Sequence, residues 1–335
     1  MTKSITLALA MIGLSSVALA GAPGNNMVVP TGTPVIAPDS TGTWSFGLEA
    51  LYMESNTNFQ YATIDTSPTT DVVDQDNQSV SNDWNWGGEV DVSYIFPGSS
   101  RDVSASYTYL NQDGSDSVGG DTGLDNVHGP LLTGLGSDEA EADVDQTLNA
   151  ATLTFGQLLT VGDRLSLHPF GGLQFASIDT TNKATYEETE AGVEGVTASY
   201  KGDSDFEGIG PRAGIDASVH LGNNFSVVGT FAGALLVGNM DSHFDIDATA
   251  IPVDADFDND SYTAVVPELD AKLGLDYMHA FNPNTSMDIQ VGYQVVNYFN
   301  AESNDFGDSV FANSVNNTSD FNYNGPYLRL QLNVA

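Results

Sequence analysis

The chain has 335 residues, 41% of them hydrophobic, and carries 45 Asp and Glu against 8 Lys and Arg, a formal net charge of −37. Because this charge repels the phosphates of nucleic acids, we expect no nucleic-acid partner. The sequence contains no cysteine, which excludes disulfides and thiolate metal sites.

The first residues have the organisation of an export signal. Lys3 precedes an apolar run from Ile5 to Leu14, and small residues follow at Ala18 and Ala20. The run is shorter than the roughly 20 residues that a helix needs to span a bilayer, so a cleaved signal peptide over residues 1–20 is favoured over a membrane anchor. Residues 21–42 hold four prolines and predict a Pro-rich leader without regular structure.

From Trp44 onward the hydrophobic period is two, as in strands with different solvents on their two faces. In residues 84–96, for example, aromatic and aliphatic side chains alternate with Asn85, Glu89, Asp91 and Ser93. Ten such segments start near Trp44, Trp84, Asp102, Thr147, Arg164, Pro211, Phe225, Val265, Ser286 and Tyr327. Residues 43–335 therefore predict one all-β domain, a closed antiparallel transmembrane β-barrel of about ten strands, with eight to twelve compatible with the pattern.

The connections alternate between short and long. Tight turns are predicted at 97–101, 161–164, 222–224 and 280–285, and long polar connections at 54–82, 111–143, 179–204, 239–262 and 301–320. Short periplasmic turns and long, here acidic, extracellular loops are typical of outer-membrane barrels.

Aromatic residues gather at the strand ends, as interfacial girdles do. The expected periplasmic girdle is Trp44, Tyr94, Phe96, Phe225 and Tyr277, and the expected outer girdle is Tyr52, Trp84, Trp86, Tyr107, Tyr109 and Phe299. A soluble β-sandwich is the alternative, but it needs no aromatic residues at both ends of its strands.

The face opposite lipid becomes the lumen, and its charges predict the function. Small residues such as Gly47, Ser104 and Gly274 share this face and leave room for a narrow water-filled path. The charged residues expected to line the pore are the acids Glu49, Glu89, Asp91, Asp216, Glu268, Asp270, Asp276 and Asp288 and the bases Arg212, Lys272 and Arg329. We expect Lys272 to pair with Asp288 and Arg329 with Glu49, which leaves most acids unpartnered and favours cations over anions.

Metal, cofactor and catalytic motifs are weak. Asp254, Asp256, Asp258 and Asp260 alternate, but Asn259 replaces the glycine of an EF-hand loop, so a solvated acidic loop is favoured and weak divalent-cation binding in the loops stays open. Gly208, Gly210 and Ala213 match a dinucleotide fingerprint, but a strand rather than a helix follows. No cofactor is expected.

The five histidines lack metal-ligand spacing and are interpreted as isolated: His128, His168, His220, His243 and His279. A barrel protease with an Asp–His pair at its outer rim would use His128 or His243, but acids surround every outer-loop residue in so acidic a chain. We therefore predict no enzyme.

Several strand segments carry a recognisable pattern: residues 205–216, 265–274, 291–293, 297–301 and 325–327 read DFEGIGPRAGID, VVPELDAKLG, VGY, NYFNA and GPY. In combination, and with looser matches at 84–87 and 171–176, these segments resemble the Legionella major outer membrane protein and its pore-forming relatives. The resemblance covers the strands from about residue 43 to the end, whereas the long loops do not match.

The resemblance implies a passive porin in the cell outer membrane, in contact with lipid and passing small hydrophilic solutes and cations. A structural or adhesive barrel that acts through its surface loops without transport is the alternative. Solute size limit and oligomeric state, a homo-oligomer included, stay open.

Overall fold

The computed structural model describes residues 42–57, 59–65, 75–119, 127–128, 136–190, 193–248, 253–303 and 318–335. The predicted signal peptide and the predicted leader up to residue 41 lie outside the described residues. In the described part of the chain, no helix is long and apolar enough to cross a membrane. The strands are β1 (Thr43–Asn56), β2 (Gln60–Asp65), β3 (Gln75–Ser79), β4 (Asn85–Ile95), β5 (Arg101–Gly119), β6 (Val127–His128), β7 (Gly136–Ser137), β8 (Glu139–Gln157), β9 (Leu159–Val161), β10 (Leu165–Glu190), β11 (Val193–Gly222), β12 (Phe225–Ala248), β13 (Val253–Asn282), β14 (Thr285–Ser303) and β15 (Thr318–Val334).

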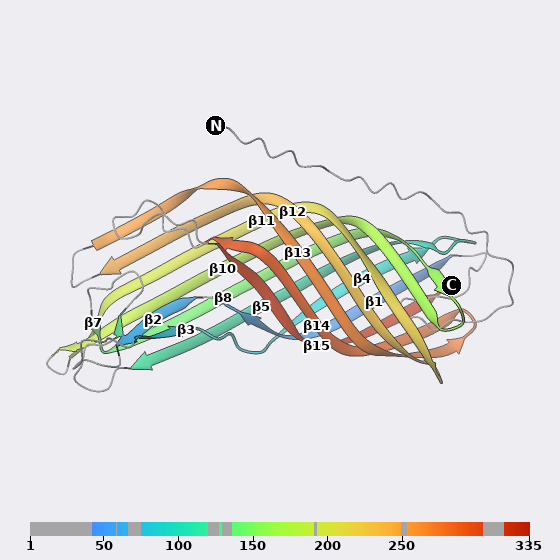
Figure 1. Cartoon of the computed structure of the whole chain (residues 1–335), viewed down its shortest axis with the longest axis horizontal. Coiled ribbons are helices and arrows are strands. Elements are labelled where there is room, and N and C mark those ends of the chain that lie inside the picture. The colour runs from blue at the N-terminus through green and yellow to red at the C-terminus, as the bar shows by residue number, and fades with distance from the viewer. Residues whose placement is uncertain are drawn as a thin grey trace.

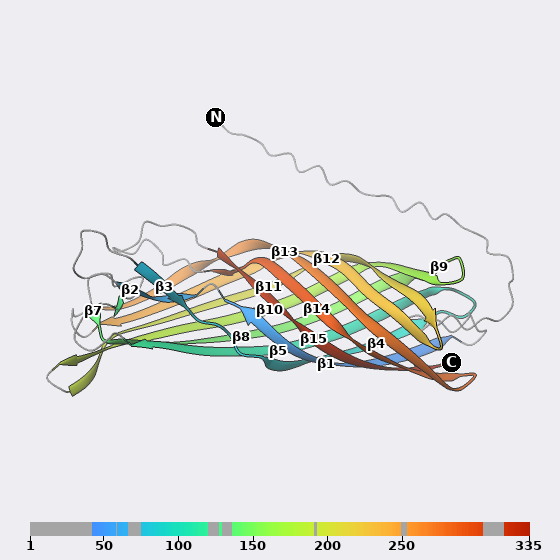
Figure 2. The ribbon, with the colours of Figure 1, turned by 60° about the horizontal axis from the view of Figure 1, so that its bottom comes forward.

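The long strands form one closed, antiparallel barrel (Figures 1 and 2). Neighbours in the chain are neighbours in the sheet, in the order β1, β4, β5, β8, β10, β11, β12, β13, β14 and β15, and β15 pairs with β1 to close the ring. The short β9 continues β8 after Leu158, because both pair with β10. The barrel is therefore ten-stranded, as predicted.

A belt of exposed apolar side chains surrounds the barrel. On β1, Phe46 and Leu48 point outward and are 50% and 63% exposed, whereas the alternate residues Ser45 and Glu49 are buried inside. The same alternation leaves Leu269, Leu273 and Leu275 exposed on β13 and Leu328, Leu330 and Leu332 exposed on β15. Exposed apolar surface on every side requires an apolar solvent around the belt.

Aromatic side chains border the belt on both sides. At the end with the tight turns, the Trp44 ring lies 4.7 Å from the Tyr94 ring, and Phe225 lies 4.9 Å from Tyr277. At the other end, the Tyr52 ring lies 5.3 Å from the Trp84 ring. These contacts group Trp44 with Tyr94, Phe225 with Tyr277, and Tyr52 with Trp84 at the two ends for which the sequence predicted girdles.

Beyond the outer girdle, the strands continue farther than predicted. β11 begins at Val193 rather than near Pro211, and β13 at Val253 rather than near Val265. We call residues 111–119, 139–147, 179–190, 193–205, 239–248 and 253–262 the outer extension. Here the polarity of the two faces inverts: Ala184 is buried inside and Lys183 is exposed outside, because water now surrounds the outer face. Backbone pairing continues through segments that the sequence analysis assigned to loops.

A second, small sheet packs at the outer end of the barrel. Its order is β3-β2-β6-β7, built from the β1–β4 and β5–β8 connections, and these strands lie at the end opposite the C-terminus (Figure 1). Tyr61, Val80 and Val127 of these connections pack in one buried cluster with residues of the outer extension such as Tyr186 and Phe244. The Tyr186 hydroxyl donates a hydrogen bond of 2.6 Å to the Tyr61 carbonyl oxygen. The connections are thus anchored against the inner wall of the outer extension.

Candidate functional site in the barrel lumen

The alternation of each strand directs the predicted charged residues inward, where each is buried or partly buried. Nine of the eleven line one cavity of about 220 Å³: Glu49, Glu89, Asp91, Asp216, Glu268, Asp270, Arg212, Lys272 and Arg329. The other two, Asp276 and Asp288, lie nearer the tight turns and are almost fully buried.

Arg212 on β11 holds two carboxylates of β13. Its Nη1 lies 2.7 Å from Glu268 Oε1, and its Nη2 lies 2.8 Å from Asp270 Oδ2. Nη1 also donates a hydrogen bond of 2.8 Å to Gln174 Oε1 on β10. The planar guanidinium suits this geometry because it presents several donors in fixed directions. Charge-assisted hydrogen bonds therefore link β10, β11 and β13 across the lumen.

Lys272 and Arg329 share the carboxylates of β1 and β4. Lys272 Nζ lies 2.8 Å from Glu49 Oε1 and 4.0 Å from Glu89 Oε2. Arg329 Nη1 lies 3.5 Å from Glu49 Oε2, and Nη2 lies 2.7 Å from Asp91 Oδ1. The predicted pair of Arg329 with Glu49, which are also register partners of β15 and β1, is confirmed.

The predicted pair of Lys272 with Asp288 is wrong. On β14, the register partner of Lys272 is Gln294, and Asp288 lies opposite Met278. Lys272 instead reaches from β13 across the lumen to β1, where Glu49 offers a buried carboxylate. Asp288 Oδ2 accepts a hydrogen bond of 2.6 Å from Asn333 Nδ2.

The expectation that most lumen acids lack partners is also wrong, because each base contacts more than one carboxylate. His168, interpreted from the sequence as isolated, lies between two more: Nε2 is 2.7 Å from Asp102 Oδ1, and Nδ1 is 2.9 Å from Asp216 Oδ2. Of the eight predicted acids, only Asp276 and Asp288 have no base within 4.0 Å among the described residues. The alternation of inward and outward residues places Asp102 and His168 in the lumen, but only the curvature of the closed barrel brings these side chains of the non-neighbouring strands β5 and β10 together.

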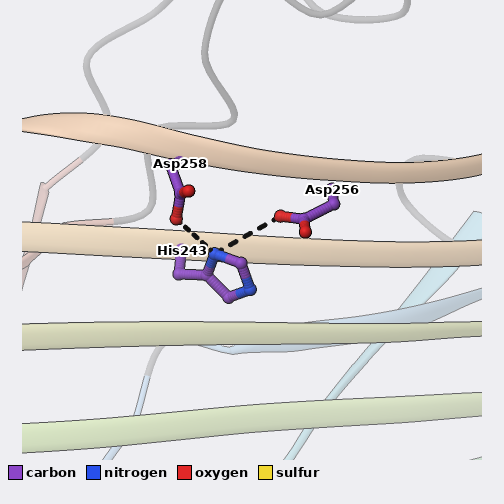
Figure 3. A group of neighbouring side chains, drawn as sticks. All are labelled: His243, Asp256 and Asp258. Carbon is purple, nitrogen blue, oxygen red and sulfur yellow. Dashed lines mark hydrogen bonds and ion pairs between the residues drawn. The ribbon is translucent and has the colours of Figure 1, made fainter.

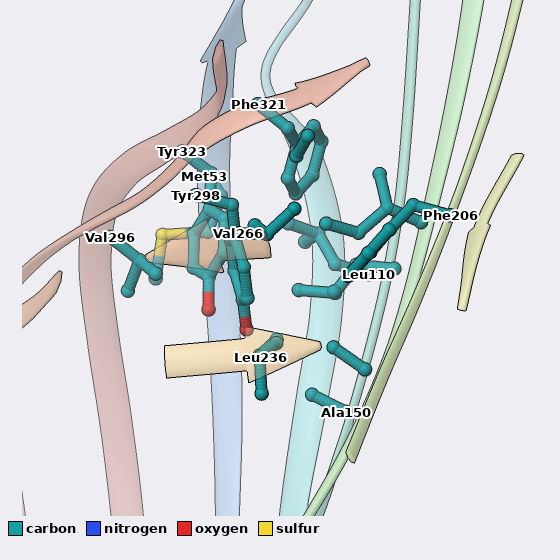
Figure 4. Packing of buried hydrophobic residues seen from close by; sticks show 14 of the residues in the cluster. Met53, Leu110, Ala150, Phe206, Leu236, Val266, Val296, Tyr298, Phe321 and Tyr323 are labelled. Carbon is teal, nitrogen blue, oxygen red and sulfur yellow. The ribbon is translucent and has the colours of Figure 1, made fainter. Parts of the chain in front are cut away.

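An apolar layer closes the lumen on the outer side of the charged cavity. Leu51, Met53, Leu110, Leu236 and Phe321 are at most 1% exposed and belong to one cluster, to which every barrel strand except β4 contributes. Figure 4 shows Met53, Leu110, Leu236 and Phe321 converging on the barrel interior from different strands. A water-filled passage would expose the side chains along it, so the lumen is closed at this level in this structure.

A buried polar layer that the sequence analysis missed follows the apolar layer. Its centre is Glu302, whose carboxylate accepts hydrogen bonds from Gln146, Thr180 and Ser319, the last at 2.7 Å. Asn82 Nδ2 in turn donates to Gln146 Oε1 at 2.7 Å. Glu302 falls in a segment predicted as a loop. No local sequence pattern indicates that its carboxylate points into the lumen.

A closed ten-stranded barrel with an outward apolar belt, aromatic girdles, tight turns at one end and long connections at the other is an outer-membrane β-barrel, located in the cell outer membrane with lipid around its belt. Residues 36–334 match the family of the Legionella pneumophila major outer membrane protein precursor, and the chain belongs to this family.

Comparisons with individual proteins give distant similarities. The chain is similar to the outer membrane protease OmpT from Escherichia coli, with a TM-score of 0.44 and 12% identity over 89% of this chain and 97% of that chain. It is also similar to a major outer membrane protein from Thermus thermophilus, with a TM-score of 0.34 and 12% identity over 88% of this chain and 98% of that chain. No curated protein matches the sequence.

Proposed function

We propose that the protein is a porin of low conductance that passes small hydrophilic solutes and favours cations. The observation that carries this proposal is the charged cavity, in which six carboxylates face Arg212, Lys272, Arg329 and the imidazole of His168, so that acids outnumber bases even when His168 is counted as a cation. Even after every base has its partners, the wall keeps an excess of negative charge. A lumen of one charge sign raises the local concentration of the opposite ion.

The apolar layer limits the flow of water and ions through the lumen. Hydrophobic constrictions oppose the entry of water and ions, so conduction requires side chains of this layer to move apart. Unbranched or flexible members such as Met53 and Met240 are suited to such movement. We therefore expect small, discrete conductance steps rather than the large steps of a wide pore.

Glu89→Gln tests the charge preference. Loss of the Glu89 carboxylate leaves every neighbouring base a partner, because Lys272 keeps Glu49 and Arg329 keeps Glu49 and Asp91. The measurement is the reversal potential of the protein in a planar bilayer under a salt gradient. We expect cation preference in the parent protein and a smaller preference in Glu89→Gln.

Asp113→Asn is the matched control, since it removes one acid from the outward face of β5. It should leave the reversal potential within error of the parent. Anion preference of the parent protein, or an equal effect of both substitutions, would contradict the proposal.

The apolar layer also favours a second candidate function, a structural or adhesive barrel that acts through its surface without transport. In that case the layer and the small sheet at the outer end would be permanent packing. The bilayer measurement separates the two functions, because protein that inserts as a heat-modifiable barrel yet shows no discrete conductance steps supports the structural function.

A further inference from the structure

His243 lies among carboxylates on the outer extension. The register places His243 of β12 opposite Asp258 of β13, and Asp245 opposite Asp256. His243 Nδ1 lies 2.8 Å from Asp258 Oδ1 and 3.6 Å from Asp256 Oδ1 (Figure 3). On the other side of the ring, Nε2 lies 3.3 Å from Asp245 Oδ2. The sequence interpretation of His243 as isolated is therefore wrong.

The donor atoms have the spacing of a metal site. One atom each from His243, Asp256 and Asp258 lies within 4.8 Å of the other two, so small side-chain rotations bring all three to one ion. The three side chains stand on two strands held in continuous register over residues 242–248 and 253–259, which fixes their Cα positions. The two carboxylates are exposed and the imidazole is partly exposed, which leaves further coordination positions open to water.

The imidazole distinguishes this cluster from the acidic surface around it. Carboxylates alone suit Ca²⁺ and Mg²⁺, whereas an imidazole nitrogen favours borderline metals such as Zn²⁺, Ni²⁺ and Cu²⁺. Three protein ligands of nitrogen and oxygen type, with a position left for water, are common at zinc sites that are not purely structural.

The charge balance also points to a cation. Asp245 and Asp256 are directly opposite each other, an arrangement that is unfavourable for like charges. With Asp258, three carboxylates surround a ring that can carry only one positive charge. A divalent cation at Nδ1 would neutralise more of this charge than a proton does.

We propose that His243, Asp256 and Asp258 form a surface site for a divalent transition-metal ion of the Zn²⁺ type, with His243 Nδ1 as the nitrogen ligand. This site lies outside the lumen, on the outward faces of β12 and β13, and does not depend on conduction.

A proton competes with the metal ion for the Nδ1 atom of His243. The charged groups around the ring are Asp245 of β12, Asp256 and Asp258 of β13, and Asp203 and Lys201 of β11, which pair with each other and lie opposite His243 and Asp245 in the register. The hydrogen bond from the ring to Asp258, followed by the charges of Asp245 and Asp256, raises the pKa of His243 above its ordinary value of 6.5. Because metal binding requires the neutral ring, affinity should fall as the pH drops through this pKa.

Calorimetric titration of the full-length barrel in detergent with Zn²⁺ tests the site. We expect one Zn²⁺ per chain in the parent protein and at least about tenfold weaker binding in His243→Ala and in Asp256→Asn, since each loses one ligand. His279→Ala, which removes an exposed histidine near the tight turns, should bind like the parent. Zn²⁺ binding should weaken from pH 7.5 to pH 5.5, and Ca²⁺ should bind more weakly than Zn²⁺.

Two results would overturn the proposal. If His243→Ala binds Zn²⁺ as the parent does, the ion is held by the acidic surface without the imidazole. If Ca²⁺ binds as tightly as Zn²⁺ and His243→Ala changes neither, the cluster is an oxygen-only surface that gathers cations unselectively. A heat-modifiability gel for each variant shows that the barrel is folded in every titration.

Discussion

Each lumen base shares its charge among several buried carboxylates. Arg212 is 10% exposed, and its partners Glu268 and Asp270 are 2% and 9% exposed as side chains. Desolvating such groups is costly, and the cost is offset only when every charge keeps its partners. A single substitution at the base therefore leaves two carboxylates buried without a counter-charge, while substituting all three groups removes the problem.

Arg212→Met should lower the free energy of unfolding by about 3–5 kcal/mol, the usual cost of breaking a buried ion pair from one side. Unfolding in guanidinium, followed by tryptophan fluorescence, measures the loss. The triple variant Arg212→Met/Glu268→Gln/Asp270→Asn should regain most of the stability.

Arg101→Met is the control for this prediction, since Arg101 is an exposed base at a tight turn. It should stay within about 0.5 kcal/mol of the parent. A loss in Arg101→Met as large as in Arg212→Met would show that charge removal in general, and not the buried partners, destabilises the barrel.

At the scale of the strands, β11 and β12 approach closely beside Pro211. Proline lacks the N–H that a strand ladder uses, and the pairing of β11 with β12 is interrupted between Ile209 and Arg212. A Cβ atom on Gly210 would lie 1.9 Å from the Leu235 carbonyl oxygen, which is backbone and cannot rotate away. Only glycine fits at this position.

Gly210→Ala should therefore destabilise the barrel by about 1–3 kcal/mol through overpacking. Gly229→Ala, one strand along, is the matched control, because its Cβ would meet its nearest atom at an ordinary 3.4 Å. The temperature at which the folded gel band converts to the unfolded one compares the two. Equal conversion temperatures would mean that β11 and β12 can separate at Gly210 without cost.

The strand alternation predicted the barrel but not its outer extension. In the belt, residues such as Leu269 and Leu273 alternate with Glu268 and Lys272, and this contrast marks strands facing lipid. In the outer extension, alanine and tyrosine alternate with polar residues at lower contrast, and the apolar face points inward. A period of two indicates a strand, but it does not tell which face is inside unless the surrounding solvent is known.

The lumen partners were only partly predictable for a related reason. Arg329 and Glu49 lie on directly paired strands, so their contact follows from the register. Lys272 with Glu49, and His168 with Asp102, join strands that are not neighbours in the sheet. Such contacts depend on the curvature and tilt of the closed barrel, which no local pattern specifies.

At the scale of the whole molecule, the interior is divided into successive layers, and the longest strands cross several of them. Along β10, His168 belongs to the charged interior, Ala176 and Ile178 to the apolar layer, Thr180 to the polar layer, and Tyr186 to the outer cluster. Nine of the ten barrel strands contribute to the apolar layer, whereas fewer strands contribute to the outer cluster. The layers stabilise the closed ring from within, and under the proposed transport function the apolar layer is the barrier that a crossing solute would meet.

The apolar layer should be the narrowest point of any passage, and two neighbouring leucines test this. Leu236 is fully buried in the layer, whereas Leu235 is 44% exposed on the outward face of the same strand. Leu236→Ser removes apolar volume and adds a hydroxyl that water can wet, so the single-channel conductance should rise, because hydrophobic constrictions gate by excluding water. Leu235→Ser makes the same chemical change toward lipid and should leave the conductance unchanged. If both variants conduct as the parent does, the constriction lies elsewhere in the lumen. If neither the parent nor Leu236→Ser conducts although both are heat-modifiable barrels, the protein acts without transport.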